Sequence, residues 1–307
     1  MLRPASFVIG LSCLQLAGVL RAQQPSVNVY DDSLIGQIRA AATAVSGELP
    51  REIRYLKFAE APARLSFLIE GADSSPVRIA MAVFQISYPK RWIIVDAGFD
   101  RRTFNELHPK DPVTYWPERW ARIQRAFRGA DAIVLTHEHW DHAIGVERGP
   151  QVSALAAKTF VTAEQLASLL DPPADAYVRL SPDSVPPYHK IEYARLYPVS
   201  AGVVLVKAPG HTPGSQWVYV KLASGREFLL VGDLVWNMAA LRTGKQRPIS
   251  VSESLKEDRG ALQKQIDFVR HFMATGVTVI TAHDDSALTA LVQGGLLRNE
   301  LRLTRAR

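Results

Sequence analysis

One hexapeptide constrains the fold of this chain more than any other part of its sequence: His137-Glu138-His139-Trp140-Asp141-His142. It directly follows residues 132–135, an apolar run that is typical of a buried strand. Alternate residues of an extended loop point the same way, so His137 and His139 are placed to bind one metal ion. Asp141 and His142 follow at a spacing that suits a second ion. Imidazole and carboxylate ligands without thiolate favour zinc. The alternative is a solvated loop with scattered histidines, which would not explain why these groups follow a buried strand.

Three more candidate ligands lie just beyond apolar runs in the second half of the chain. His211 follows residues 203–206, Asp233 follows 228–231 and His283 follows 277–280. Because strand ends along one edge of a sheet converge, we expect these side chains to meet the hexapeptide. A simple turn is the alternative for Asp233. The remaining histidines lack such a setting and are interpreted as surface residues: His108, His189 and His271.

Composition narrows the possible chemistry. The chain has 307 residues, of which 47% are hydrophobic and 21% charged, so it can form a core of ordinary size. Its only cysteine is Cys13, which lies in the N-terminal segment that we expect to be cleaved as a signal peptide. The mature chain would then have no disulfide, no thiolate metal site and no cysteine nucleophile. The net charge is +6, but no run of like charge is long enough to indicate nucleic-acid binding.

The first 22 residues have the features of a secretory signal peptide. Arg3 precedes a mostly apolar run over residues 7–20, and Ala22 is a candidate cleavage position. The run is shorter than the roughly 20 residues that a membrane span needs, although an uncleaved anchor is the alternative. We therefore expect a periplasmic or secreted protein with no membrane attachment after cleavage.

Beyond the signal, the sequence predicts a leader segment over residues 23–60 and one domain over 61–307, without an internal linker. Helical spacing after Asp31 predicts an early helix, and residues 171–190, with five prolines, are expected to be irregular. Segments with a β-forming composition are 66–70, 77–86, 92–95, 132–135, 159–162, 203–206, 217–222, 228–231 and 277–280. Predicted helices are 117–127, 163–170, one long helix over 255–272, and 286–296.

The order of these candidate ligands resembles that of the metallo-β-lactamase superfamily, over roughly residues 65–290. The resemblance implies an α/β fold, the four-layer αβ/βα sandwich, in which two mixed sheets lie face to face with helices outside. It implies that Asp233 bridges two metal ions and that Asp96 orients a ligand histidine, for which a turn residue is the alternative. It assigns the first ion to His137, His139 and His211, and the second to Asp141, His142 and His283.

Within that superfamily the N-acyl-homoserine lactonases are most similar, because they share the Gly232-Asp233 turn and the His283-Asp284 pair. Diiron oxidoreductases place a carboxylate at the position of His139. Glyoxalase II carries a helical domain after its last ligand, whereas 24 residues follow His283 here. One departure concerns Trp236, where many lactonases have a tyrosine that supports the substrate carbonyl. Indole offers one N–H and no acidic hydroxyl, so we expect Trp236 only to shape an apolar wall.

The resemblance implies a dinuclear-metal hydrolase, with two divalent ions expected to be zinc. It would open a lactone or related cyclic ester of a small-molecule substrate by attack of a metal-bridging hydroxide. Asp141 or Asp233 would pass a proton to the departing alkoxide. The alternatives are an exported metallo-β-lactamase acting on β-lactam antibiotics, a mononuclear-iron sulfur dioxygenase, and a binding module without catalysis. The bridging Asp233 argues against the β-lactamase, and the complete ligand set argues against the binding module.

Overall fold

The computed structural model describes residues 30–107, 114–148, 151–171 and 179–304. The predicted signal peptide, with Cys13, and also His108 lie outside the described residues. Within those ranges, no helix has both the length and the apolar character needed to cross a membrane.

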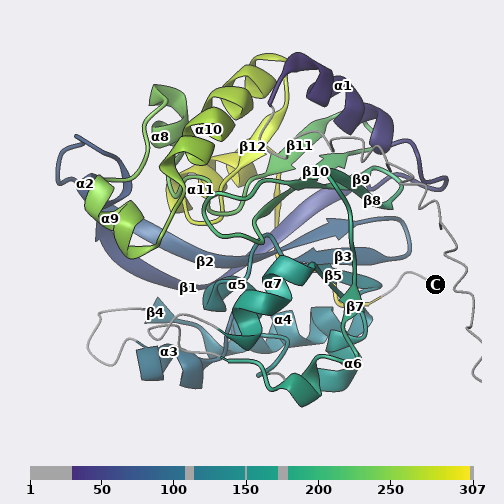
Figure 1. Ribbon diagram of the computed structural model, residues 1–307. Helices are drawn as coiled ribbons and strands as arrows, with labels where there is room; N and C mark the ends of the chain where they lie inside the picture. Colours follow the sequence, from purple (N-terminus) through teal and green to yellow (C-terminus); the bar gives the residue numbers. More distant parts are fainter. Residues whose placement is uncertain (1–29, 108–113, 149–150, 172–178, 305–307) are drawn as a thin grey trace, which may run out of the picture.

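The larger of two sheets is mixed and occupies the centre of the molecule (Figure 1). Its longest strands are the antiparallel pair β1 (Glu52–Arg64) and β2 (Pro76–Ser87), followed on one side by strands that run parallel to one another. In spatial order its strands are β13 (Arg298–Asn299), β1 (Glu52–Arg64), β2 (Pro76–Ser87), β3 (Trp92–Val95), β5 (Ala132–Val134), β6 (Thr159–Val161) and β7 (His189–Lys190), and β4 (Thr114–Tyr115) pairs with β1.

The smaller sheet faces the larger one and comes from the second half of the chain. It is antiparallel except at one edge, where two strands run parallel. In spatial order its strands are β12 (Thr278–Ile280), β11 (Glu227–Leu230), β10 (Gln216–Lys221), β9 (Val203–Lys207) and β8 (Leu196–Ser200).

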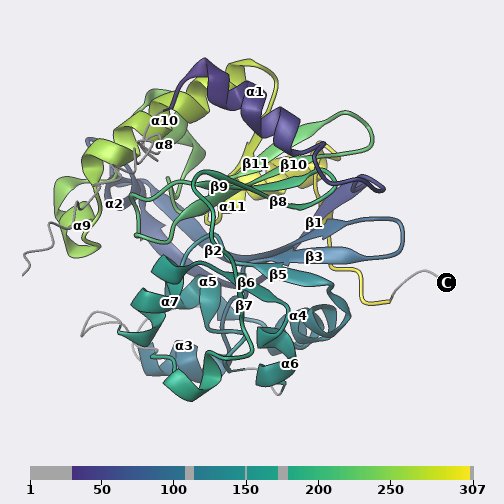
Figure 2. The same cartoon turned by 45° about the vertical axis from the view of Figure 1, so that its right-hand side comes forward.

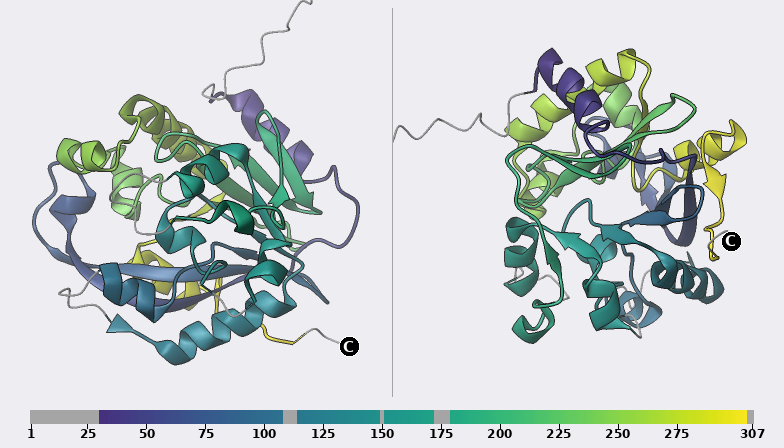
Figure 3. Two further views of the ribbon diagram at one scale, coloured as in Figure 1. Left: turned by 60° about the horizontal axis from the view of Figure 1, so that its bottom comes forward. Right: turned by 90° about the vertical axis from the view of Figure 1, so that its right-hand side faces the viewer.

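Strands β9, β10, β11 and β12 of the smaller sheet are buried on both faces, as their continuous apolar runs require, whereas the edge strand β8 is only partly buried. In β9, Val203 and Leu205 join the core between the two sheets, whereas Val204 and Val206 pack with the outer helices. A third cluster lies beneath the larger sheet and includes Phe127. Figures 2 and 3 show helices covering the outside of each sheet. The predicted four-layer αβ/βα sandwich is therefore confirmed.

Helices form the two outer layers and the site loops. α1 and α10 cover the smaller sheet, and α4 packs under the larger one (Figure 1). Their bounds are α1 (Asp32–Ala41), α2 (Leu65–Leu68), α3 (Arg101–Leu107), α4 (Pro117–Gly129), α5 (Trp140–Ala143), α6 (Val152–Ala156), α7 (Ala163–Leu170), α8 (Met238–Thr243), α9 (Ile249–Ser254), α10 (Arg259–Ala274) and α11 (Asp285–Gln293), with a 3₁₀ turn at Pro182–Ser184.

The predicted long helix over residues 255–272 is wrong in one respect, because the chain breaks at its start. Leu255 ends α9, and Lys256 adopts a left-handed backbone with φ of 57°, which no helix continues through. The side chain of Asp258 then caps α10 by accepting from the backbone N–H of Ala261. Glu257 lies in the break.

The structure differs from the predicted elements in three further places, two in the N-terminal half of the chain and one at the edge of the smaller sheet. The β-forming segment at 66–70 overlaps the short helix α2, whose backbone is tied to Gln246 through Glu70. The predicted boundary between residues 60 and 61 falls inside β1, so the end of the leader belongs to the larger sheet. Strand β8 was not predicted; it contains Pro198, which an edge strand tolerates because one side of its backbone needs no partner.

Candidate metal centre

Parallel strand pairs bring the predicted ligands to one edge of each sheet. In the larger sheet, Val95 of β3 pairs with Val134 of β5, so the loops that carry Asp96 and His137 leave side by side. In the smaller sheet, β11 and β12 pair in the same way, and their loops carry Asp233 and His283. Because the two sheets face each other, the four loops meet between them.

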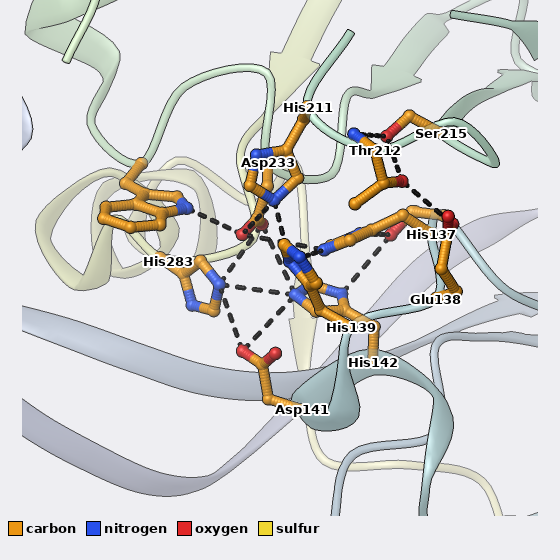
Figure 4. Close-up of polar contacts among 12 residues, drawn as sticks. His137, Glu138, His139, Asp141, His142, His211, Thr212, Ser215, Asp233 and His283 are labelled. Atoms are coloured by element: carbon orange, nitrogen blue, oxygen red, sulfur yellow. Dashed lines mark hydrogen bonds and ion pairs between the residues drawn. The ribbon is translucent and has the colours of Figure 1, made fainter. Parts of the chain in front are cut away.

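The first group of ligands is a cluster of three imidazoles. The Nδ1 atom of His139 lies 3.1 Å from Nε2 of His137 and 3.0 Å from Nε2 of His211 (Figure 4). Two nitrogens bound to one tetrahedral zinc ion lie about 3.3 Å apart, given bonds of about 2.0 Å. Both distances are therefore close to the spacing that one ion requires, and all three nitrogens lie within 4.8 Å of one another.

The second group lies beside the first. The short helix α5 begins after His139 and turns Asp141 and His142 toward His283, which comes from the other sheet (Figure 4). The Oδ2 atom of Asp141 is 3.5 Å from Nε2 of both histidines, and those two nitrogens are 3.3 Å apart. Asp141 keeps 16% of its side chain exposed, compared with 7% for His283 and 3% for His142.

Asp233 lies between the two groups and presents one oxygen to each. Its Oδ2 is 3.8 Å from Nε2 of His137 and 3.5 Å from Nε2 of His211. Its Oδ1 is 3.4 Å from Nε2 of His142 and 3.2 Å from Nε2 of His283. This Oδ1 is buried and has no hydrogen-bond partner among the described residues. An unsatisfied buried carboxylate oxygen is costly, and a bound cation would satisfy it.

The outward nitrogens of several ligand histidines have hydrogen-bond partners. Asp96 Oδ2 accepts from Nδ1 of His142 at 2.9 Å, and the carbonyl of Ala80 accepts from Nδ1 of His283 at 2.7 Å. Such partners fix the ring orientation and leave Nε2 free as the ligand atom. The geometry around Asp96 is that of an orienting carboxylate, in agreement with the predicted role.

Thr136 ties these outer partners together. Its backbone N–H donates to Asp96 at 2.7 Å, and its hydroxyl lies 3.1 Å from Nδ1 of His137. Gly232 packs against it: φ there is +52°, and an added Cβ would lie 2.9 Å from the Cβ of Thr136. Glycine is needed at this position for both reasons.

The electrostatics of the pocket suit cations. Burial and the neighbouring imidazoles lower the pKa of His137, and they lower the pKa of His139 to about 3, so both rings are neutral at pH 7. Burial would lower the pKa of His142 and His283 too, but nearby carboxylates outweigh it and raise both. Burial would raise the pKa of Asp233, but the charges of the facing histidines hold it well below its usual range.

Trp236 contacts the bridging carboxylate itself. Its indole N–H donates to Oδ2 of Asp233 at 2.6 Å, and its ring stacks on Phe67 with centroids 5.9 Å apart. The sequence predicted only an apolar wall at this position and did not predict that the indole N–H donates to the bridging carboxylate.

Sequence reasoning assigned no role to several residues that contact the candidate ligands or join their loops. The carboxylate of Glu138, inside the motif, accepts from the hydroxyl of Thr212 and the backbone N–H of Gly214, which joins the two ligand loops (Figure 4). Glu257 accepts from Nδ1 of His211 at 2.6 Å and pairs with Arg247. Only the position of Glu138 within the hexapeptide offered a signal.

The histidines set aside as surface residues stay away from the centre where they are described. His271 is exposed on α10 and lies 3.0 Å from a carboxylate oxygen of Asp32. His189 is exposed at the edge of the larger sheet, beside Phe160.

Comparison with known proteins gives three findings. The family model described as the metallo-beta-lactamase superfamily matches residues 80–268, more than half of the chain. No curated protein matches. Many solved structures share the fold, at low sequence identity.

Three of those structures illustrate the likeness. An N-acyl homoserine lactone hydrolase with the product N-hexanoyl-L-homoserine bound at its catalytic metal centre has a TM-score of 0.62 and 14% identity, covering 79% of this chain and 96% of that one. A probable metal-dependent hydrolase from Staphylococcus aureus has 0.61 and 14%, covering 78% and 91%. A dizinc quorum-quenching lactonase has 0.54 and 14%, covering 79% and 91%.

Proposed function

This chain belongs to the metallo-β-lactamase superfamily, and from that premise we propose that it is a two-zinc hydrolase that opens a lactone or related cyclic ester. One observation carries the proposal above the others: Asp233 presents a separate oxygen to each of two ligand groups. In the first group, one ligand atom from each of His137, His139, His211 and Asp233 lies within 4.8 Å of the others. In the second group, the same holds for Asp141, His142 and His283.

The residues present fit divalent cations. The donor set is nitrogen and oxygen, the imidazoles of the first group are neutral, and the buried Oδ1 of Asp233 lacks a hydrogen-bond partner in the described part of the chain. His137, His139 and His211 would hold one ion, Asp141, His142 and His283 the other, with Asp233 between them. When bound, such ions supply water with a pKa near 7 and a Lewis acid for a carbonyl.

The remaining chemistry falls to the side chains of this chain. Opening a cyclic ester with water leaves an alkoxide that needs a proton. Asp141, which is more exposed than His142 and His283, can take a proton from the attacking water and deliver it to that alkoxide. Asp233 is the second candidate for that transfer, but its Oδ2 already accepts from Trp236. We therefore assign proton transfer to Asp141 and the bridging position to Asp233.

The fold neighbours support the choice of a lactone. Two of the three described above are lactone-opening enzymes, one with the ring-opened product bound at its metal centre. For the location of the enzyme we retain the proposal of an exported protein, periplasmic or secreted, which rests on the composition of residues 1–22.

Metal analysis combined with a substrate panel tests this function. Purified protein is expected to hold about two zinc ions per chain, to lose turnover of acyl-homoserine lactones and simple lactones after chelation, and to regain it with zinc, cobalt or manganese. Full activity of metal-stripped protein would refute the proposal. A chromogenic cephalosporin in the same panel separates the β-lactamase alternative, and one iron per chain would indicate the dioxygenase.

Trp236→Phe tests the contact between the indole and the bridging carboxylate. It keeps the aromatic stack on Phe67 but removes the N–H, and a hydrogen bond to a charged group contributes about 1.5–3 kcal/mol. We expect kcat/KM for a lactone to fall by roughly 10-fold to 100-fold, since each 1.4 kcal/mol corresponds to about a factor of ten. Phe67→Leu is the matched control for the stack alone, and equal losses in both variants would assign the effect to packing.

A further inference from the structure

We propose that Arg247 and Glu257 form a buried clamp that positions His211 and Asp233 for the first metal ion. This inference rests on the proposed function, because it assigns a role toward an ion that the ligand set implies. Neither residue belongs to the ligand set or to any motif of the sequence. Both act through other side chains and are therefore positioning residues.

The clamp begins at the outward nitrogen of His211. Glu257 accepts from Nδ1 of His211 at 2.6 Å, while Nε2 of the same ring points to His139 and Asp233. An imidazole that donates from Nδ1 presents the lone pair of Nε2, which is the form that binds a metal ion. Glu257 thus holds this ring in its ligand tautomer and in one orientation.

Arg247 connects that carboxylate to the bridging residue. Its Nη2 donates to Glu257 and, at 2.9 Å, to the backbone carbonyl of Asp233. Its guanidinium also lies over the ring of Trp236, with its carbon 4.6 Å from the ring centroid. One side chain therefore contacts the loop of the bridging ligand, the indole that donates to it, and the partner of His211.

Burial makes the pair interdependent. The side chain of Glu257 is fully buried and that of Arg247 is 2% exposed. A buried ion pair adds little to stability, and breaking one leaves an uncompensated charge. Positioning the ligands is a role that explains why such a pair lies here.

The backbone conformation around Lys256 places the side chain of Glu257 beside His211. The left-handed residue Lys256 separates α9 from α10, and the backbone N–H of Asp258 then donates to the carbonyl of Gly210 at 2.8 Å. That bond fixes the break against the residue before His211. A left-handed backbone is strained for a non-glycine residue, and the surrounding contacts must offset that strain.

Glu257→Gln tests the clamp, with cobalt(II) titration of metal-stripped full-length protein as the readout. Glutamine keeps the size of the side chain but removes the charge that pairs with Arg247. We expect affinity for one of two cobalt ions to fall about 10-fold to 100-fold in chelator competition, with the other unchanged. The visible absorption of the weakened site should change too. Glu227→Gln, which breaks a remote pair with Arg39, is the matched control and should leave both affinities unaltered.

The possible outcomes separate the inference from the proposed function. Two unchanged cobalt affinities in Glu257→Gln would overturn the clamp alone. Equal weakening of both ions, in parallel with a lower melting temperature of the metal-free variant, would assign a merely structural role and overturn it as well. An unmodified protein that binds no cobalt would overturn the clamp and the proposed function together.

A second variant covers the case in which the single substitution prevents folding. The double variant Arg247→Met/Glu257→Leu replaces the ion pair by apolar side chains of similar size, an exchange that is often neutral for stability. His211 then has no acceptor for its Nδ1–H. Selective loss of one cobalt ion from the folded double variant supports the clamp, and two ions bound at unaltered affinity overturn it.

Discussion

Asp233→Ala is expected to lower the metal content of the purified protein from two ions per chain to one or fewer, and kcat/KM for a lactone by about 10³-fold. Alanine removes a side chain that faces both ligand groups. Metal ions contribute several kcal/mol to stabilising a hydrolytic transition state, and about 4 kcal/mol corresponds to a thousandfold in rate. Elemental analysis and steady-state kinetics on the same preparation measure both quantities.

The control for this variant is Asp267→Ala, an exposed carboxylate on α10 that lies outside both ligand groups. It should retain both ions and full activity. The bridging assignment fails if Asp233→Ala keeps two ions and unmodified turnover. It also fails if the control loses metal to the same extent, since the effect would then follow from net charge.

Asp141→Asn is expected to slow the opening of alkyl lactones by about 10²-fold to 10⁴-fold, the range contributed by a general acid. Asparagine retains an oxygen that faces His142 and His283 but cannot donate a carboxylic proton. The loss should therefore fall on kcat while the metal content stays at two ions per chain.

The leaving group distinguishes proton transfer from ligand loss in this variant. An aryl ester releases a phenolate that needs no proton, so Asp141→Asn should hydrolyse it within about tenfold of the unmodified rate. Equal losses on alkyl lactones and aryl esters would contradict the proton-transfer role. Loss of one ion together with both activities would leave Asp141 as a ligand only.

The sequence could predict that the candidate ligands lie together, because each candidate depends on a local pattern. His137 and His139 follow a buried strand within one motif, and the later ligands follow short apolar runs that the structure shows as β9, β11 and β12. Convergence at a sheet edge then needs only the general behaviour of strand ends. The layers of the sandwich, in contrast, came from the resemblance to a family and not from these patterns.

Residues that act through tertiary contacts left no such pattern. Glu257 is an ordinary acidic residue in a stretch that looks helical, and only the left-handed backbone at Lys256 turns it inward. The short helix α2 forms in a β-prone segment, next to a backbone bond between Glu70 and Gln246. Both depend on parts of the chain that lie close in space but far apart in sequence.

The division of ligands between the two sheets has a consequence for how the protein holds together. Each ligand group takes residues from the loop after β5 in the larger sheet and from loops of the smaller sheet, such as His211 and His283. Ions bound there would cross-link the two sheets, since sliding one sheet over the other would separate the ligands. A ligand present at a concentration one thousand times its Kd stabilises the folded protein by about 4 kcal/mol. The ions would therefore stabilise the fold as well as take part in the reaction.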